Sequence, residues 1–123
     1  MRLLVDSSGW IEYFAGGPLA ERYGSYLGGP AVLITPTIVV SEVYKKIKRE
    51  RGEELALRVT ASLTATEVVP LTESIALLAA DISLQYGLAM ADAIVYATAR
   101  DQEARVLTSD ADLKDLPGVV YLI

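Results

Sequence analysis

The sequence predicts a single three-layer α/β/α domain, in which helices cover both faces of a parallel sheet. The chain has 123 residues, the length of one domain with a sizeable core. Its short strand-like segments are continuously apolar, which is typical of strands buried on both faces. Helical segments separate them, as the connections of a parallel sheet require. Because the chain contains no repeat, low-complexity tract or linker, residues 1–123 are expected to form one domain.

Short apolar segments mark the expected strands. In chain order they are Arg2–Val5, Ala31–Ile34, Glu67–Val69, Arg105–Leu107 and Val119–Leu122. The first has the sequence RLLV and ends at Asp6, and the third is closed by Pro70. Such continuous apolar runs predict central strands rather than strands with one face in water.

The segments between these strands carry helix start and stop signals. Ser7 and Ser8 can cap the first helix, and Pro36 is expected in the first turn of the third, where proline is tolerated. Four of the helical segments are each ended by a glycine, at Gly16, Gly28, Gly52 and Gly87. The expected helices are a short one that carries Trp10, Ile11 and Phe14, then Leu19–Leu27, Thr35–Arg51, Glu53–Ala65, Thr72–Tyr86 and Ala91–Glu103, with a helical turn at Asp110–Lys114.

The composition limits the chemistry that the chain can perform. It has no Cys, which excludes disulfides, thiolate zinc sites and thiol nucleophiles, and no His, the usual general base. Catalysis must therefore use carboxylates, hydroxyls, Lys or Arg, or a hard metal held by oxygen. The net charge of −5 argues against broad electrostatic binding of nucleic acid, although a local basic strip remains compatible with it.

The apolar runs are also too short for a membrane span, which needs roughly 18 residues. The first residues lack the apolar core of a signal peptide. We therefore expect a cytoplasmic protein with no membrane association.

Four carboxylates lie where the pattern predicts the end of a strand or an early turn of a helix. They are Asp6, Glu42, Asp92 and Asp110. Each is surrounded by apolar sequence, where an unpaired charge is costly. Few cations are near them in the chain, so a divalent metal is the expected partner. Because Asp6 and Asp110 follow strands, both belong at the carboxyl edge of the sheet. This pattern indicates metal-assisted chemistry on phosphate.

Several of these residues also have a purely structural interpretation. Asp6 and Asp110 can cap the helical segments that follow them. Asp112 is expected to be solvated, although it is close enough in sequence to be an auxiliary ligand. Asp92 is harder to explain in this way, because a first-turn acid gains at most about 1 kcal/mol from the helix dipole, less than burial of the charge costs. Thr108 and Ser8 could orient the carboxylates or merely serve turns.

Basic residues follow Glu42 at helical spacing, at Lys45, Lys46 and Arg49. The structural interpretation is an ordinary Glu42–Lys46 pair worth roughly 0.2–0.5 kcal/mol. The functional interpretation is a metal or base carboxylate, with cations beyond it that hold a nucleic-acid backbone. The sequence leaves both open.

Taken together, these residues resemble the PIN-domain ribonuclease family, in particular the VapC-type toxins of toxin–antitoxin systems. The resemblance covers essentially the whole chain. In order, its motifs are Leu3-Leu4-Val5-Asp6-Ser7-Ser8, the helical Glu42, Ala91-Asp92-Ala93-Ile94 leading to Ala97-Thr98-Ala99, and Val106-Leu107-Thr108-Ser109-Asp110-Ala111-Asp112-Leu113. Leu113 departs from the family, which often has Phe there, and this difference should affect packing rather than chemistry.

The resemblance implies a parallel sheet of about five strands and an acidic quartet of Asp6, Glu42, Asp92 and Asp110, supported by Thr108 and Ser8. It implies Mg²⁺ or Mn²⁺ held by Asp6, Asp92 and Asp110, with Glu42 as a direct or water-mediated ligand. The expected activity is hydrolysis of RNA phosphodiesters by metal-activated water. The expected partners are the RNA substrate, a second copy in a homodimer and a cognate antitoxin.

Two other families of similar fold class fit the sequence poorly. A phosphoacceptor receiver domain has paired acids after its first strand, whereas Asp6 is followed by Ser7-Ser8. A phosphatase of the haloacid dehalogenase type needs a second Asp at position 8, which is Ser8. Two alternatives within the PIN fold remain: a non-catalytic binding or scaffold module, and an RNA-processing nuclease without an antitoxin. The target RNA remains open.

Overall fold

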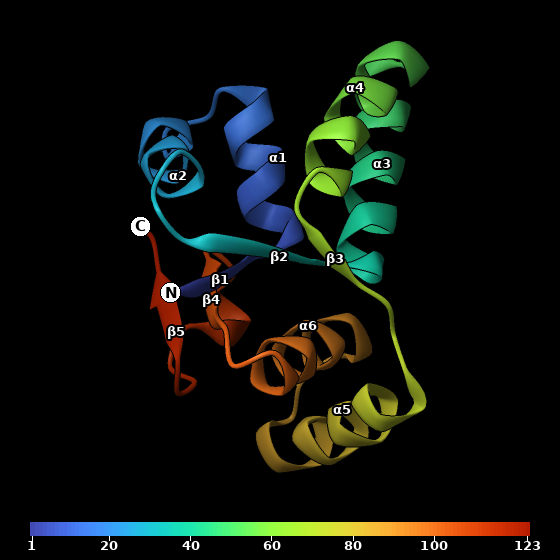
Figure 1. The fold of residues 1–123 in the computed structure, drawn as a ribbon, viewed down its shortest axis with the longest axis vertical. Helices are drawn as coiled ribbons and strands as arrows, with labels where there is room; N and C mark the ends of the chain where they lie inside the picture. Colours follow the sequence, from blue (N-terminus) through green and yellow to red (C-terminus); the bar gives the residue numbers. More distant parts are fainter.

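The computed structural model describes residues 1–123 and contains a five-stranded parallel sheet between two layers of helices (Figure 1). The strands are β1 Arg2–Val5, β2 Val32–Pro36, β3 Glu67–Val69, β4 Arg105–Thr108 and β5 Val119–Tyr121. The helices are α1 Ser7–Ala15, α2 Ala20–Leu27, α3 Thr37–Arg51, α4 Glu53–Thr64, α5 Glu73–Tyr86 and α6 Met90–Asp101, with a 3₁₀ turn η1 at Ala111–Leu113. The predicted three-layer α/β/α class and its five strands are confirmed.

The path of the chain reverses once across the sheet, whose strand order is β3-β2-β1-β4-β5. From β1 the chain moves outward to β2 and β3, and helices α1 to α4 lie on one side of the sheet in Figure 1. It then returns to β4 through α5 and α6, which lie on the other side. Right-handed crossovers that run in opposite directions place their helices on opposite faces. The adjacent strands β1 and β4 therefore form a topological switch point, where such sheets open a crevice at their carboxyl ends.

Two predicted element starts differ from the structure. Of the caps that the sequence allows for α1, Asp6 is the one formed, rather than Ser7 or Ser8, because its side chain accepts the backbone N–H of Gly9. Pro36 is the last residue of β2 and the cap of α3, whereas the sequence suggested that the helix begins at Thr35-Pro36. Beyond Ile34, β2 pairs with β3 alone, and a proline at such a strand end is tolerated although it lacks an N–H.

Two other predicted ends also differ. Helix α6 was expected to continue to Glu103 but ends at Asp101. Glu103 has a φ of 52°, in the left-handed region, which no residue can adopt inside an α-helix. The turn expected at Asp110–Lys114 is shorter, because Asp110 is its cap rather than its first residue.

The core lies between the sheet and the two helix layers. Leu3, Leu4 and Val5 of β1 are fully buried, and α6 is buried continuously over Ala93–Ala99. That agrees with the apolar sequence that surrounds Asp92. Helix α3 buries Val39, Val43 and Ile47 at helical spacing, so its adjacent face, with Glu42, turns toward the crevice and solvent.

No single helix has the length and hydropathy of a membrane span; α5 and α6 reach that composition only as a pair bent by 116°.

Candidate metal centre

Asp6 is buried at the end of β1 and is held by three hydrogen bonds. Its Oδ1 accepts the Ser8 hydroxyl at 2.8 Å and the Gly9 N–H at 3.1 Å, and its Oδ2 accepts the Thr108 hydroxyl at 2.5 Å. The side chain is only 4% exposed. Burial raises the pKa of Asp6; the hydrogen bonds from Thr108, Ser8 and Gly9 oppose this effect, and the charge of Asp110 adds to it. Asp6 is thus both a helix cap and a fixed acid in the crevice.

Thr108 connects the first and last acids of the predicted quartet. Besides donating to Asp6, its hydroxyl oxygen accepts the backbone N–H of Asp110 at 2.9 Å. Asp110 in turn caps η1, since its Oδ1 accepts the N–H of Asp112 at 2.9 Å. This turn brings the Asp112 side chain back toward the crevice.

Asp92, Asp110 and Asp112 converge: one carboxylate oxygen of each lies within 4.8 Å of the other two. Asp92 and Asp110 are half-buried and Asp112 is exposed. Burial, the charge of Asp110 and a hydrogen bond to it raise the pKa of Asp92 to about 7, and Asp112 and Asp6 add to the repulsion. Three acids that cannot all ionise without a compensating charge, and that offer oxygen alone, suit a hard divalent cation. This donor set therefore fits a divalent metal ion.

Glu42 lies next to this group, on α3. It is half-buried, and burial raises its pKa, while the nearby Ser7 hydroxyl lowers it and the charges of Asp6 and Asp110 raise it further. The fold therefore places Asp6 and Asp110 in electrostatic range of both Glu42 and Asp92. The tight group of three, however, contains Asp112 rather than Asp6 or Glu42.

The predicted basic residues border the same crevice. Ser7, Ile11, Glu42, Lys45, Lys46 and Arg49 line a hollow of about 270 Å³, which we call the α3 hollow. The ordinary Glu42–Lys46 pair is not formed, because Lys46 Nζ lies 3.9 Å from Glu50 instead. The α3 hollow thus joins an acid of the candidate site to three cations.

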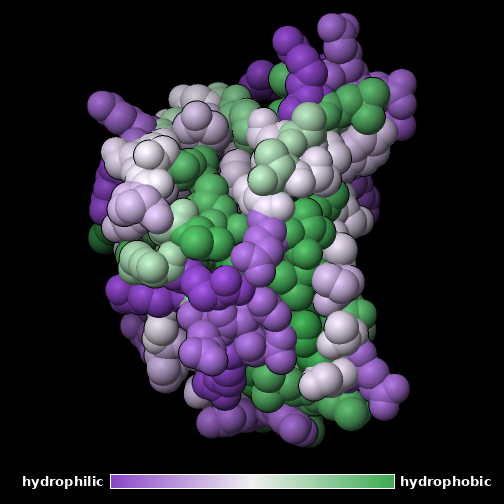
Figure 2. Space-filling model, in the orientation of Figure 1, coloured by the Kyte–Doolittle hydropathy of each residue, from purple (hydrophilic) through white to green (hydrophobic).

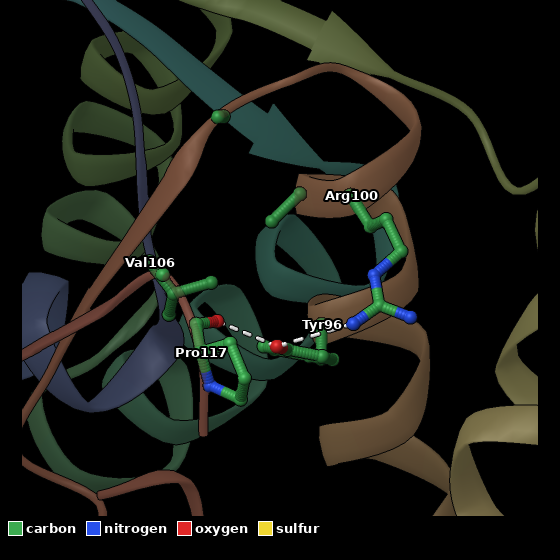
Figure 3. Close-up of a pocket in the computed structure, with 7 residues that line it drawn as sticks. Tyr96, Arg100, Val106 and Pro117 are labelled. Atoms are coloured by element: carbon green, nitrogen blue, oxygen red, sulfur yellow. Dashed lines mark hydrogen bonds between the residues drawn. The ribbon is translucent and has the colours of Figure 1, made fainter. Parts of the chain in front are cut away.

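A second hollow, of about 250 Å³, lies at the opposite edge of the sheet, beside the residues that precede β4 and β5 (Figure 3). The Tyr96 hydroxyl donates to the Pro117 carbonyl at 2.5 Å, and the Arg100 guanidinium stands 5.2 Å from the centre of the Tyr96 ring. This hollow contains no carboxylate, and its tyrosine is already paired. It is therefore not part of the metal centre.

Sequence reasoning missed Tyr23 and Ser109. The Tyr23 hydroxyl donates to Ser109 at 3.0 Å, beside the segment that carries Asp110. A tyrosine within an amphipathic helix has the same pattern as an ordinary core residue, so no local signal identifies it.

A family model described as PIN domain matches residues 3–119. Among solved structures, a toxin–antitoxin complex from Klebsiella pneumoniae has a TM-score of 0.83 at 25% identity, covering 97% of this chain and 96% of that one. Mycobacterium tuberculosis VapC20, a toxin that cleaves the sarcin-ricin loop, has a TM-score of 0.80 at 21% identity, covering 98% and 100%. DNA-bound VapBC from Salmonella typhimurium has a TM-score of 0.73 at 14% identity, covering 99% and 97%. The last two likenesses show the fold alone. No curated protein matches the chain by sequence.

Proposed function

The chain belongs to the PIN-domain family, and we propose that it is a VapC-type toxin, a Mg²⁺- or Mn²⁺-dependent endoribonuclease that a cognate antitoxin neutralises. The proposed nuclease is the single domain of residues 1–123. The observation that carries the proposal is the convergence of Asp92, Asp110 and Asp112 beside Asp6 and Glu42 at the carboxyl edge of the sheet. The assignment of the chain as a toxin is supported by its structural similarity to a toxin–antitoxin complex at 25% identity.

In this proposal Asp92, Asp110 and Asp112 would hold the cation together with Asp6, and Glu42 would bind it directly or through water. When bound, the cation would polarise the phosphodiester and activate water for attack. Asp92 would be held as a carboxylate by a bound cation, because burial and the charge of Asp110 raise its pKa and a cation would offset both effects. Ser8 and Thr108 keep the Asp6 carboxylate oriented by donating to its two oxygens.

Glu42 is suited to accept a proton during attack, since burial and its acidic neighbours raise its pKa. Attack by water rather than by the RNA 2′-hydroxyl would leave 5′-phosphate and 3′-hydroxyl ends. Lys45, Lys46 and Arg49 of the α3 hollow would hold the phosphates of the RNA next to the acids. Such contacts position a strand without reading its sequence, so they do not define the target.

We further propose a homodimer formed through α5 and α6. Leu77, Leu84 and Met90 on these helices are exposed, and Leu84 is 86% accessible. Leu71, Ala80 and Ile94 help to line an apolar hollow of about 390 Å³ between them. In Figure 2, apolar atoms lie among polar ones in the lower right of the view, where Figure 1 places α5. An apolar face of this kind marks an association surface.

As an enzyme acting on RNA, the protein would work in the cytoplasm.

The proposal is tested first by calorimetric titration of Mn²⁺ into the wild-type protein and Asp92→Asn. Asp81→Asn is the matched control, because Asp81 is an exposed acid on α5, outside the carboxylate group. We expect saturable binding that Asp92→Asn abolishes and Asp81→Asn retains. A wild-type protein that binds no Mn²⁺ at millimolar concentration and neutral pH would instead support a non-catalytic PIN module.

Cleavage is tested second, with total RNA, Mn²⁺ and the same three proteins. Wild type and Asp81→Asn should produce discrete fragments, and Asp92→Asn or added chelator should prevent them. Ligation that requires a 5′-phosphate then identifies the ends. Fragments with 5′-hydroxyl ends would contradict attack by water.

A further inference from the structure

Tyr23 of α2 reaches the candidate metal centre through Ser109. Its side chain is fully buried, and its hydroxyl donates to Ser109 Oγ at 3.0 Å across 86 residues of sequence. Burial raises the pKa of Tyr23, so the hydroxyl remains protonated and available as a donor at neutral pH. Ser109 stands between Thr108, which binds Asp6, and Asp110, which joins the carboxylate group. The bond therefore ends on the segment from which Asp110 projects.

This bond anchors that segment to the rest of the fold. The other hydrogen bonds of residues 109–112 stay within residues 108–114: Asp110 N–H to Thr108, Asp112 N–H to Asp110, Leu113 N–H to Asp110 and Lys114 N–H to Ala111. Such local bonds shape the turn but do not fix its position relative to α1 or α6. The Tyr23 hydroxyl supplies the hydrogen bond from a distant element.

The Tyr23 ring also packs against the segment that carries Asp6. A Cβ atom at Gly9 would stand 2.5 Å from Tyr23 Cε1 and 2.7 Å from Val5 Cγ1, so only glycine lets the ring lie this close to α1. The N–H of the same Gly9 donates to Asp6 Oδ1. The Tyr23 side chain thus contacts Gly9, whose N–H orients Asp6. It also binds Ser109, which lies next to Asp110.

We propose that Tyr23 is a positioning residue of the metal centre, which holds the Asp6 and Asp110 segments in the arrangement that lets the carboxylates share one cation. This inference rests on the proposed function only in assuming a divalent cation at that site. Tyr23 touches no carboxylate of the group of three, so it acts through Ser109 and Gly9.

The test is the Mn²⁺ dissociation constant of Tyr23→Phe, Ser109→Ala and their double variant, measured by calorimetry. Phe fills the space of the Tyr23 ring, so the fold is retained. We expect each single variant to weaken binding by about tenfold, the lower end of what loss of an outer partner of a metal ligand costs. The double variant should be no weaker than either one, because both remove the same bond. Ser109→Thr keeps a hydroxyl and should retain wild-type affinity.

Tyr96→Phe is the matched control. Tyr96 is also buried and also donates to a loop, at Pro117, but at the opposite edge of the sheet. It should lose thermal stability as Tyr23→Phe does while its Mn²⁺ affinity stays within about twofold of wild type. Equal Mn²⁺ affinity in wild type and Tyr23→Phe would overturn this inference and leave the proposed function standing. Absence of binding in the wild type would overturn both.

Discussion

The Thr108 hydroxyl donates to the Asp6 carboxylate at 2.5 Å, joining two residues that are 102 positions apart in the sequence. Asp6 follows β1 and Thr108 ends β4, so the bond bridges the two strands at the topological switch point. Because the same hydroxyl accepts the Asp110 N–H, one buried oxygen sets the spacing between the first and last acids of the candidate site.

Replacing Thr108 with Val, which has the same shape, should destabilise the protein and weaken its metal binding. Asp6 Oδ2 and the Asp110 N–H both lose their hydrogen-bond partner, the first in a buried and the second in a partly buried place, which should cost about 1–3 kcal/mol of the free energy of unfolding. Urea unfolding and Mn²⁺ calorimetry measure the two effects. Thr98→Val is the control, since the buried Thr98 donates to the Ile94 carbonyl within α6. Unchanged Mn²⁺ affinity in Thr108→Val would contradict this role.

Asp92 should make the metal-free protein less stable as the pH rises. Its folded-state pKa of about 7 exceeds its ordinary value of 3.8, so the folded protein holds this proton more tightly than the unfolded chain. The stabilisation is complete below about pH 4 and is lost as the pH rises through 7. Since Asp92 is only half-buried, solvent screening limits the effect to about 1–2 kcal/mol.

The corresponding measurement is the melting temperature with chelator at pH 5 and pH 8. Asp92→Asn carries no charge at either pH, so at pH 8 it should melt roughly 3–8 °C above the wild type. Asp81→Asn should follow the wild type at both pH values. A lower melting temperature for Asp92→Asn at pH 8 would show that Asp92 is not repelled by its acidic neighbours.

Mn²⁺ affinity should have the opposite dependence on pH. The cation competes with the Asp92 proton, so at pH 6 binding should be about tenfold weaker than at pH 8, given a single group with a pKa of about 7. Titrations in two buffers of different ionisation enthalpy would count the proton released at pH 6. A pH-independent dissociation constant would place the cation away from Asp92.

The sequence is enough to locate Asp6 and Asp110, for a physical reason. Both follow continuous apolar strands, and the carboxyl ends of parallel strands meet at one edge of the sheet, so their proximity does not depend on details of the loops. Asp92 could be identified because an acid before a buried helical run needs compensation. The fold class follows from the same alternation of strands and helices.

Three features of the site could not be predicted from the sequence, because they depend on three-dimensional geometry: the position of Asp112, the partner of Lys46 and the Tyr23–Ser109 hydrogen bond. Asp112 joins the carboxylate group only because Asp110 caps a 3₁₀ turn that reverses the chain. The spacing of Lys46 permits a pair with either Glu42 or Glu50, and the structure has the pair with Glu50. Tyr23 and Ser109 are brought together by the packing of α2 against α1, which no local pattern predicts.

The proposed dimer should depend on the exposed leucines of α5. Leu77→Lys combined with Leu84→Lys places two charges on the apolar face, and burial of unpaired charges would oppose association. We expect light scattering to show a dimer for the wild type and a monomer for this variant. Leu57→Lys is the control, because Leu57 is similarly exposed but lies on α4. A wild-type monomer, or a dimer that both sets of substitutions leave intact, would contradict an interface on α5 and α6.

The cations of the α3 hollow should contribute to RNA binding without acting on the metal. In Lys45→Gln and Arg49→Gln, the Mn²⁺ affinity should stay within about twofold of wild type, whereas KM for cleavage rises because a phosphate contact is lost. The slope of log affinity against log salt should fall by about 1 for each cation removed. Arg58→Gln on α4 removes the same charge outside the hollow and should leave both quantities unchanged. An equal rise in KM in all three variants would show that the net charge of the protein, rather than the α3 hollow, determines RNA binding.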